Sequence, residues 1–388
     1  MSLKLYNTLS RKTEVFNSIS KGKINFFVCG PTVYDFSHLG HAKTYIQFDM
    51  IVKYLRFRGF KAYYLQNITD IDDKIIKKAN ETGENWKNIS RRYEKLYKED
   101  MKSLGVDSVN KYAPATGYIK EIISQVKRLI AKGYAYRISD GWYFDLKKDR
   151  DYGKLAGRTS LGAEDSVSRI DENKGKRNPG DFCLWKFSKP GEPVWKTDIG
   201  DGRPGWHIED TAITEKEFGS QYDIHGGATD LIFPHHEAEI AQMESISGKK
   251  PMVRYWMHTG FFKINSEKMA KSLGNFMTIR DVLERYKKDV IRYFFAATHY
   301  KKPIDFSEKS IENARNSVER LKNLVSGMKD DKKINKEYLE EFQKEVNDDI
   351  YLPYGIAVLW MLVMDEISYG KLRTIKKIDE VFCFGLLK

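Results

Sequence analysis

Cysteine is scarce in this chain of 388 residues. The three thiols, Cys29, Cys183 and Cys383, are odd in number and widely spaced, which excludes a small secreted scaffold held by disulfides. No apolar run approaches the length that spans a membrane, and residues 1–20 lack the apolar core of a signal peptide. We therefore expect a cytoplasmic protein with no membrane partner.

The composition is that of a globular protein with a surplus of positive charge. Hydrophobic residues make up 41% and aromatic residues 13% of the chain, whose length allows two or three domains with a sizeable core. The net charge of +12 comes from 66 Lys and Arg against 54 Asp and Glu. Such a surplus favours attraction to a polyanion. Ordinary solvated lysines would give the same composition, and charge alone does not decide between the two.

The stretch around residues 26–45 is the one around which the rest of the chain is predicted to be built. An apolar run over residues 24–28 precedes Cys29-Gly-Pro, and a helical pattern begins at His38, so we predict a strand, a turn and a helix. His38 and His41 are three residues apart and share a helix face beside free N–H groups at the helix start. This arrangement predicts a phosphate site. The alternative is that a histidine at a helix start is a cap or a surface residue.

Strand and helix patterns alternate along the chain and predict an α/β fold with a parallel sheet. No P-loop sequence of the form G-x-x-x-x-G-K-[ST] is present, which disfavours a P-loop enzyme. Gly226 and Gly227 lie in a predicted strand, where glycine permits the close approach of a ligand such as adenosine. We expect further strands over residues 61–67, 205–210 and 257–264, a helix opened by Pro234, an Ser-Asp-Gly hairpin near residue 140, and mainly helices beyond residue 278.

Four chemically suitable side chains form a candidate metal site. His235 and Glu239 are four residues apart, on one face of a predicted helix, and can bind one metal ion. Cys29 and Asp210 are each placed at the end of a predicted strand. Together the four side chains make a cluster of metal ligands. The alternative is a lost or weakened site in which Asp210 is only a polar strand end.

Two short motifs resemble the signatures of class I aminoacyl-tRNA synthetases. The run from His38 to His41, HLGH, resembles their HIGH motif, and the run from Lys268 to Ser272, KMAKS, resembles their KMSKS loop. Longer runs, CGPTVYD, NITDIDDK, GRPGWHIE and DLIFPHHE, are similar to cysteinyl-tRNA synthetases. The resemblance covers most of the chain. It implies a Rossmann-like parallel-sheet catalytic domain with an insertion, followed by a C-terminal α-helical bundle.

The resemblance also implies a division of the chain into segments. Residues 1–113 and 204–306 would form the two halves of the catalytic domain. Residues 114–203 would form an insertion that helps to guide the acceptor end of tRNA. Residues 307–388 would form a helical bundle that contacts tRNA and is short at its C-terminus.

In cysteinyl-tRNA synthetases the positions that match Cys29, His235 and Glu239 bind zinc, and Asp210 stands where the family normally has a second cysteine. Aspartate oxygen is also a zinc ligand, so we expect one Zn²⁺ per chain, made harder by the exchange of thiolate for carboxylate. Zinc binds a deprotonated thiol better than a hydroxyl, which would separate cysteine from serine without an editing domain. Milder departures from the family are Ala228, Ala238 and Ala270.

The resemblance assigns further roles, residue by residue. The residues expected to take part in catalysis, by supplying positive charge to the phosphoryl group, are His38, His41, Lys268 and Lys271. Those expected to bind ATP are His38, Gly40, His41, Gly226, Gly227 and Lys271. Those expected to line the cysteine pocket are Cys29, Thr69, Trp206 and Asp230.

The expected activity is that of an ATP-dependent, AMP-forming cysteine–tRNA ligase. It would activate L-cysteine to cysteinyl-adenylate with release of pyrophosphate, using Mg²⁺ with ATP, and transfer cysteine to the 3′-terminal ribose of tRNA(Cys). We expect a monomer. Two alternatives remain: a cysteine:amino-sugar ligase of the mycothiol pathway, and a non-catalytic tRNA-binding paralogue.

Overall fold

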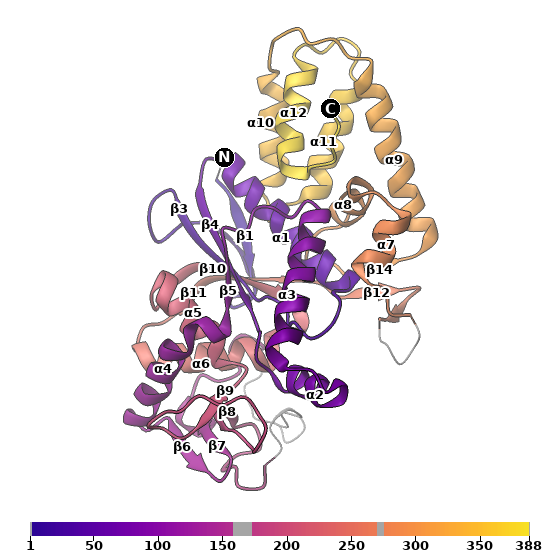
Figure 1. The fold of residues 1–388 in the computed structure, drawn as a ribbon. Coiled ribbons are helices and arrows are strands. Elements are labelled where there is room, and N and C mark those ends of the chain that lie inside the picture. The colour runs from indigo at the N-terminus through magenta and orange to yellow at the C-terminus, as the bar shows by residue number, and fades with distance from the viewer. Residues whose placement is uncertain (1, 158–172, 270–274, 388) are drawn as a thin grey trace.

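A five-stranded parallel sheet forms the centre of the computed structural model, which describes residues 2–157, 173–269 and 275–387 (Figure 1). The strands lie in the order β11, β10, β3, β4, β5, and each neighbouring pair is parallel. Their bounds are β3 Lys23–Val28, β4 Lys61–Ile68, β5 Lys111–Pro114, β10 Tyr222–Ala228 and β11 Val253–Thr259. The chain extends the sheet to both sides of β3, so ligands are expected at the carboxyl ends of the strands. The predicted α/β parallel-sheet fold is confirmed.

Different helices cover the two faces of this sheet. Phe26 and Phe27 of β3 are both fully buried and point to opposite faces, because side chains alternate along a strand. Phe26 packs in the cluster that contains α1, whereas Phe27 packs in the cluster that contains Ile213 and Ile240. The helices concerned are α1 Leu39–Phe57, α5 Ile208–Phe218 and α6 Glu237–Ser247. Burial on both faces explains why β3 reads as a continuous apolar run.

A second sheet, with four antiparallel strands, lies at the end of the molecule opposite the C-terminal helices (Figure 1). Its strands are β6 Ala135–Ile138, β7 Gly141–Phe144, β8 Phe182–Phe187 and β9 Gly202–Pro204, and the helix α4 Ile119–Ala131 precedes them in the chain. β6 and β7 pair around Ser139 and Asp140, which confirms the predicted hairpin. These elements fall almost wholly within residues 114–203, but the domain boundaries themselves stay a prediction.

The remaining elements connect and extend the central sheet. β1 Lys4–Asn7 and β2 Lys12–Val15 form a hairpin, and α2 Asp73–Thr82 and α3 Trp86–Ser103 link β4 to β5. β12 Phe262–Ile264, β13 Glu267–Lys268 and β14 Ile304–Phe306 form a small sheet. The helices beyond it are α7 Ile279–Arg285, α8 Lys288–Ala296, α9 Glu308–Ser326, α10 Lys336–Val346, α11 Leu352–Met364 and α12 Lys371–Phe382, so the predicted C-terminal helical region is confirmed (Figure 1). Within the described ranges, every helix is too short or too polar to cross a membrane.

Pro234 opens a helical stretch, as predicted: Phe233 is extended, with φ −135° and ψ 132°, and the backbone is helical from Pro234 through His236 into α6. Two local predictions are wrong. Residues 205–210 do not form a strand, because α5 begins at Ile208 and Asp210 lies in its first turn. Residues 257–264 form parts of two strands, β11 and β12, which are separated at Gly260. In both segments tertiary packing, rather than the local sequence pattern, sets the backbone.

Candidate active site

The histidine motif begins α1 with an unusual cap. The Gly40 N–H donates to His38 Nδ1 at 3.1 Å, and the His38 N–H donates to His41 Nδ1 at 3.4 Å, which closes a capping box. The two rings stack with centroids 3.8 Å apart. The capping role that the sequence left as an alternative is therefore present. It is compatible with a phosphate site, because the first turn of α1 contains no acidic residue and the helix start keeps its positive character.

The surroundings of His41 favour the neutral form of its ring. Burial, followed by the nearby charges of His38 and Lys74, holds the pKa of the His41 imidazole well below its ordinary value. In that form its ring offers hydrogen bonds and no charge. The lowered pKa favours the neutral ring at His41, and the expectation that both histidines supply positive charge stays a prediction.

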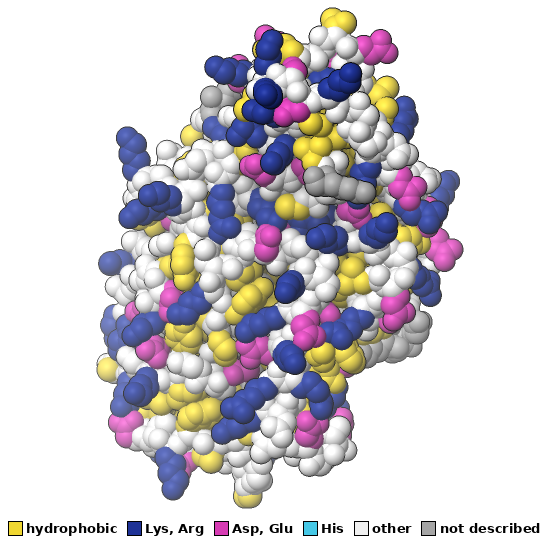
Figure 2. Space-filling model, turned by 45° about the horizontal axis from the view of Figure 1, so that its top comes forward, with side chains coloured by type: hydrophobic (Ala, Val, Ile, Leu, Met, Phe, Trp, Pro, Cys, Tyr) yellow, Lys and Arg dark blue, Asp and Glu magenta, His cyan; other side chains and the backbone are white. Residues whose placement is uncertain are grey.

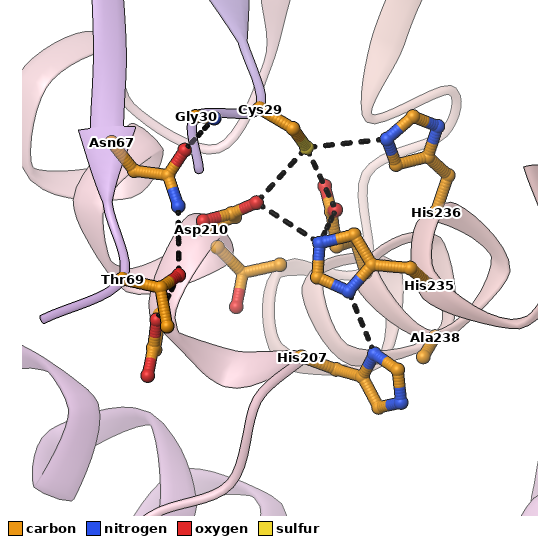
Figure 3. Close-up of polar contacts among 12 residues, drawn as sticks. Cys29, Gly30, Asn67, Thr69, His207, Asp210, His235, His236 and Ala238 are labelled. Carbon is orange, nitrogen blue, oxygen red and sulfur yellow. Dashed lines mark hydrogen bonds and ion pairs between the residues drawn. The ribbon is translucent and has the colours of Figure 1, made fainter. Parts of the chain in front are cut away.

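The four predicted metal ligands do come together, from three separate segments of the chain (Figure 3). Cys29 follows β3, Asp210 lies in α5, His235 precedes α6 and Glu239 lies in its first turn. Asp210 Oδ2 lies 3.1 Å from both Cys29 Sγ and His235 Nε2, and His235 Nε2 lies 3.1 Å from Glu239 Oε1. Cys29 Sγ is 3.8 Å from Glu239 Oε1. One sulfur, one imidazole and two carboxylates thus face a common point.

The charges of this cluster call for a cation. Cys29, Asp210, His235 and Glu239 are all buried, and Asp210 Oδ1 is a buried oxygen that accepts no hydrogen bond within the described chain. Burial, then the charges of Asp210 and Glu239, raises the pKa of the Cys29 thiol, and burial with Asp210 raises that of Glu239. Buried acids without a cation are costly, whereas a metal ion would stabilise their charged forms. The donor set of S, N and two O suits zinc.

Two further histidines lie against Cys29 and were not singled out from the sequence. His225 Nε2 is 3.4 Å and His236 Nε2 is 3.2 Å from Cys29 Sγ, and with Glu239 they form a second set of possible ligands. Burial lowers the pKa of both rings, so both are neutral, the form in which imidazole binds metals. The signals in the sequence were a histidine just before Gly226-Gly227 and a second histidine beside His235.

An open cavity of about 520 Å³ is lined both by Cys29 of the metal cluster and by the histidine motif. Its wall includes the predicted residues Cys29, His38, Gly40, His41, Trp206 and Asp230. Trp206 stacks on the ring of His235 with centroids 4.2 Å apart, so it forms the boundary between the cavity and the metal cluster. The cavity lies at the carboxyl end of β3, as a doubly wound sheet predicts.

Three predicted residues lie elsewhere than on the wall of the cavity that the described residues form. Thr69 is buried and donates to Glu209 Oε2 at 2.9 Å, so its hydroxyl holds the start of α5 (Figure 3). A Cβ at Gly226 would meet the Phe48 ring at 2.6 Å, and one at Gly227 would meet His236 Cε1 at 2.7 Å. Glycine at both positions is thus explained by close packing of side chains, and a role in binding ATP stays a prediction.

The lysine motif is only partly described. Lys268 ends β13, the second strand of a short hairpin with β12. Lys271 lies outside the described residues. Met269, which follows Lys268, lines the cavity, so the start of the motif reaches the same space as His38 and His41.

A comparison with known protein families identifies the family of the chain. Residues 15–316 match the model of the tRNA synthetases class I (C) catalytic domain. The chain belongs to this family. Curated relatives named cysteine–tRNA ligase include those of Thermococcus gammatolerans, 51% identical over 331 residues, and Thermoplasma acidophilum, 54% identical over 319 residues. These alignments cover 85% and 82% of the chain and 69% and 70% of the relatives.

Solved structures agree on the fold. A methionyl-tRNA synthetase of Mycobacterium tuberculosis in complex with methionyl-adenylate aligns over 92% of this chain and 88% of its own, with a TM-score of 0.66 and 15% identity. A leucyl-tRNA synthetase of Agrobacterium radiobacter, in a ternary complex with tRNA, aligns over 94% and 84%, with a TM-score of 0.66 and 10% identity. The predicted class I synthetase fold is confirmed, as are the family and the activity of an ATP-dependent cysteine–tRNA ligase.

Proposed function

We propose that this single cavity selects L-cysteine at the metal cluster and activates it at the histidine motif, before cysteine is transferred to tRNA(Cys). The observation that carries the proposal is that one cavity is lined both by Cys29 and Trp206, which belong to or contact the metal cluster, and by His38 and His41 at the start of α1. A cysteine whose thiol lies at the first end would extend its carboxylate toward the second. The geometry therefore supports substrate selection and chemistry in one space.

At the selecting end, we assign Cys29, Asp210, His235 and Glu239 as the ligands of one zinc ion. The buried acids and the unpartnered oxygen of Asp210 support this assignment. When bound there, zinc supplies a soft Lewis acid that prefers a thiolate to a hydroxyl. The chain's own contribution is to exclude water and to position Trp206, which packs on His235 and would limit the size of the side chain admitted.

At the activating end, the cysteine carboxylate attacks the α-phosphate of ATP. An oxygen–phosphorus bond forms, the bond between the α- and β-phosphates breaks, and pyrophosphate leaves. The positive end of the α1 dipole and the His41 ring stabilise the phosphoryl oxygens, and Lys268 and Lys271 supply the positive charge. Catalysis of this kind consists mainly of positioning and charge stabilisation. Mg²⁺ is assigned to ATP by the chemistry of the reaction.

The partner in the second half-reaction is tRNA. Figure 2 shows Lys and Arg side chains spread over one face of the molecule and interleaved with acidic ones, rather than gathered in a single patch. With a net charge of +12, such a surface supports contacts to many phosphates of a large polyanion. We assign the insertion, residues 114–203, to the acceptor end and residues 307–388 to tRNA contacts. A monomeric state and a cytoplasmic location stay predictions.

Cysteine-dependent exchange of pyrophosphate into ATP, with zinc content measured on the same sample, tests this function. We expect exchange with cysteine and not with serine, about one zinc per chain, and transfer of cysteine to tRNA(Cys) whose affinity falls steeply with salt. Exchange without charging of tRNA, but with transfer to an amino sugar, would favour the sugar ligase. Binding of tRNA without any exchange would favour the non-catalytic paralogue.

A further inference from the structure

Lys43 is a buried lysine in the wall of the active-site cavity, two residues beyond His41 in α1. Only 1% of it is exposed, and the residue lines the same space as His38 and His41. Lysine is almost never fully buried unless its charge is paired. Among the ion pairs of the described residues, none includes Lys43, so an ordinary salt bridge does not explain its burial.

The partners of Lys43 are two backbone carbonyls from distant segments. Its Nζ donates to Gly260 O at 2.6 Å and to Tyr300 O at 3.4 Å. Gly260 joins β11 to β12, and Tyr300 precedes β14. The Gly260 N–H also donates to Tyr300 O at 2.9 Å. Lys43 thus holds three segments at one point: α1, the turn into β12, and the approach to β14.

This point is the base of the hairpin that leads to the lysine motif. β12 pairs with β13, which ends at Lys268, and with β14 on its other edge. A Cβ at Gly260 would meet Lys301 O at 2.5 Å, so the two backbone segments pack too closely for any other residue. Next to Lys43, Thr44 Oγ1 lies 3.1 Å from Thr259 Oγ1, which adds a second contact between α1 and the same turn.

An apolar or neutral side chain could hold these segments together without the free-energy cost of burying a charge. Burial lowers the pKa of Lys43 to about 7, which shows that its charged form is disfavoured by the protein around it. Phosphates in the cavity would favour that charged form. A lysine at this position therefore combines two donors for the carbonyls with a charge that suits an anionic substrate.

We propose that Lys43 is a positioning residue for adenylate formation, which fixes the hairpin of β12 and β13 against α1 and so sets Lys268 and Met269, the described start of the lysine motif, relative to the two histidines. The proposal rests on the proposed function, because only a phosphoryl transfer in this cavity needs both motifs at one substrate. A misplacement of about 1 Å is enough to cost a reaction of this kind about 100-fold. Loss of the contact at the base of the hairpin should therefore reduce kcat more than it reduces the stability of the fold.

The test compares Lys43→Met, which keeps the length of the side chain, with two other variants. Lys43→Arg keeps donors for the carbonyls, and Lys53→Met removes a second partly buried lysine of α1 that pairs with Asp49 and Asp107 instead. Two quantities are measured: kcat and KM for cysteine in pyrophosphate exchange, and amide hydrogen exchange of residues 261–268 with residues 352–364 as the internal reference.

We expect Lys43→Met to lower kcat at least about tenfold with KM for cysteine within about twofold, and to speed hydrogen exchange in residues 261–268 but not in 352–364. Lys43→Arg should recover most of both, and Lys53→Met should leave both unchanged. If Lys43→Met fails to fold, Lys43→Gln, a shorter donor, is expected to show the same pattern.

Wild-type kcat and wild-type hydrogen exchange in a folded Lys43→Met variant would overturn the proposal. A uniform rise of hydrogen exchange in both segments would also overturn it, because Lys43 would then support the fold as a whole. If the wild-type chain shows no pyrophosphate exchange, the proposed function fails, while local hydrogen exchange still decides whether Lys43 holds the hairpin.

Discussion

The two ends of the active-site cavity are built in opposite ways. The phosphate end uses neighbours in sequence. His38, Gly40 and His41 form one cap, and the two histidine residues are partly exposed. The proposed metal end takes its ligands from the residue after β3, from α5, from the turn before α6 and from α6 itself, and all four are buried. A local motif can fix a helix start by itself, whereas the metal end exists only once the sheet and its helices have packed.

This difference predicts which function a substitution at each end would alter. At the proposed phosphate end the dipole of α1 adds to the side chains, so the site would depend on the helix start as well as on any one side chain. At the metal end every ligand is a side chain, and Asp210 replaces the cysteine that the family resemblance leads one to expect. Perturbing one end should therefore alter ATP chemistry, and perturbing the other should alter the choice of amino acid.

The largest effect is expected at the phosphate end. Lys271→Ala should lower kcat for pyrophosphate exchange by about 100- to 1,000-fold, because its charge is needed as the phosphoryl group transfers. KM for cysteine should change little. Steady-state exchange kinetics check this, with Lys309→Ala, an exposed lysine of α9, as the control. An equal loss in cysteine binding would break the separation of the two ends.

The contrast between the two ends also explains what the sequence could predict. The strand over residues 24–28 and the helix start at His38 are local patterns, and both were predicted correctly. The ligand set was inferred although Asp210 was wrongly placed on a strand, because resemblance supplied the positions. His225, His236 and Lys43 were missed, since their proximity to Cys29 or Gly260 arises from packing between distant segments.

The second prediction tests the metal end. Asp210→Ala should weaken zinc binding by about 10- to 100-fold, taking the effect of losing a supporting group as a lower guide. Discrimination of cysteine from serine should fall with it, because the bond to the thiolate carries that choice. Asp210→Cys should retain zinc and make the ion less electrophilic. Metal content and the ratio of kcat/KM for the two amino acids are measured.

KM for ATP should stay within about twofold in both Asp210 variants, since the phosphate end is separate. An alanine variant with full zinc content and unchanged selectivity would show that Asp210 is only a structural residue beside three ligands. Retention of zinc through His225 or His236 would be detected as unchanged content with altered selectivity, and would join the second ligand set to the site.

A smaller effect is expected from Thr69, which lies behind the metal end. Thr69→Val removes the hydroxyl that donates to Glu209 Oε2 while keeping the shape of the side chain. Losing one buried hydrogen bond costs about 1 kcal/mol, so KM for cysteine should rise about fivefold and kcat should be nearly unchanged. Thr211→Val, a buried threonine of the same helix as Asp210 that bonds to Gln125, is the control. A change in KM for ATP instead would contradict the assignment to the cysteine pocket.

The smallest effect concerns the pH dependence of stability at Lys43. Its folded pKa of about 7 lies below the ordinary value of 10.5, so burial of the charged form costs free energy in full below about pH 7. As the pH rises from 7 toward 10.5, the folded protein holds the neutral amine and this cost is progressively lost. The wild type should therefore gain stability relative to Lys43→Met between pH 6 and pH 9, by about 3 °C in Tm. Thermal melts of both proteins at the two pH values measure the difference. If the difference in Tm between the two proteins is the same at both pH values, or is smaller at pH 9, Lys43 stays charged in the folded protein. The phosphate end would then contain a permanent positive charge.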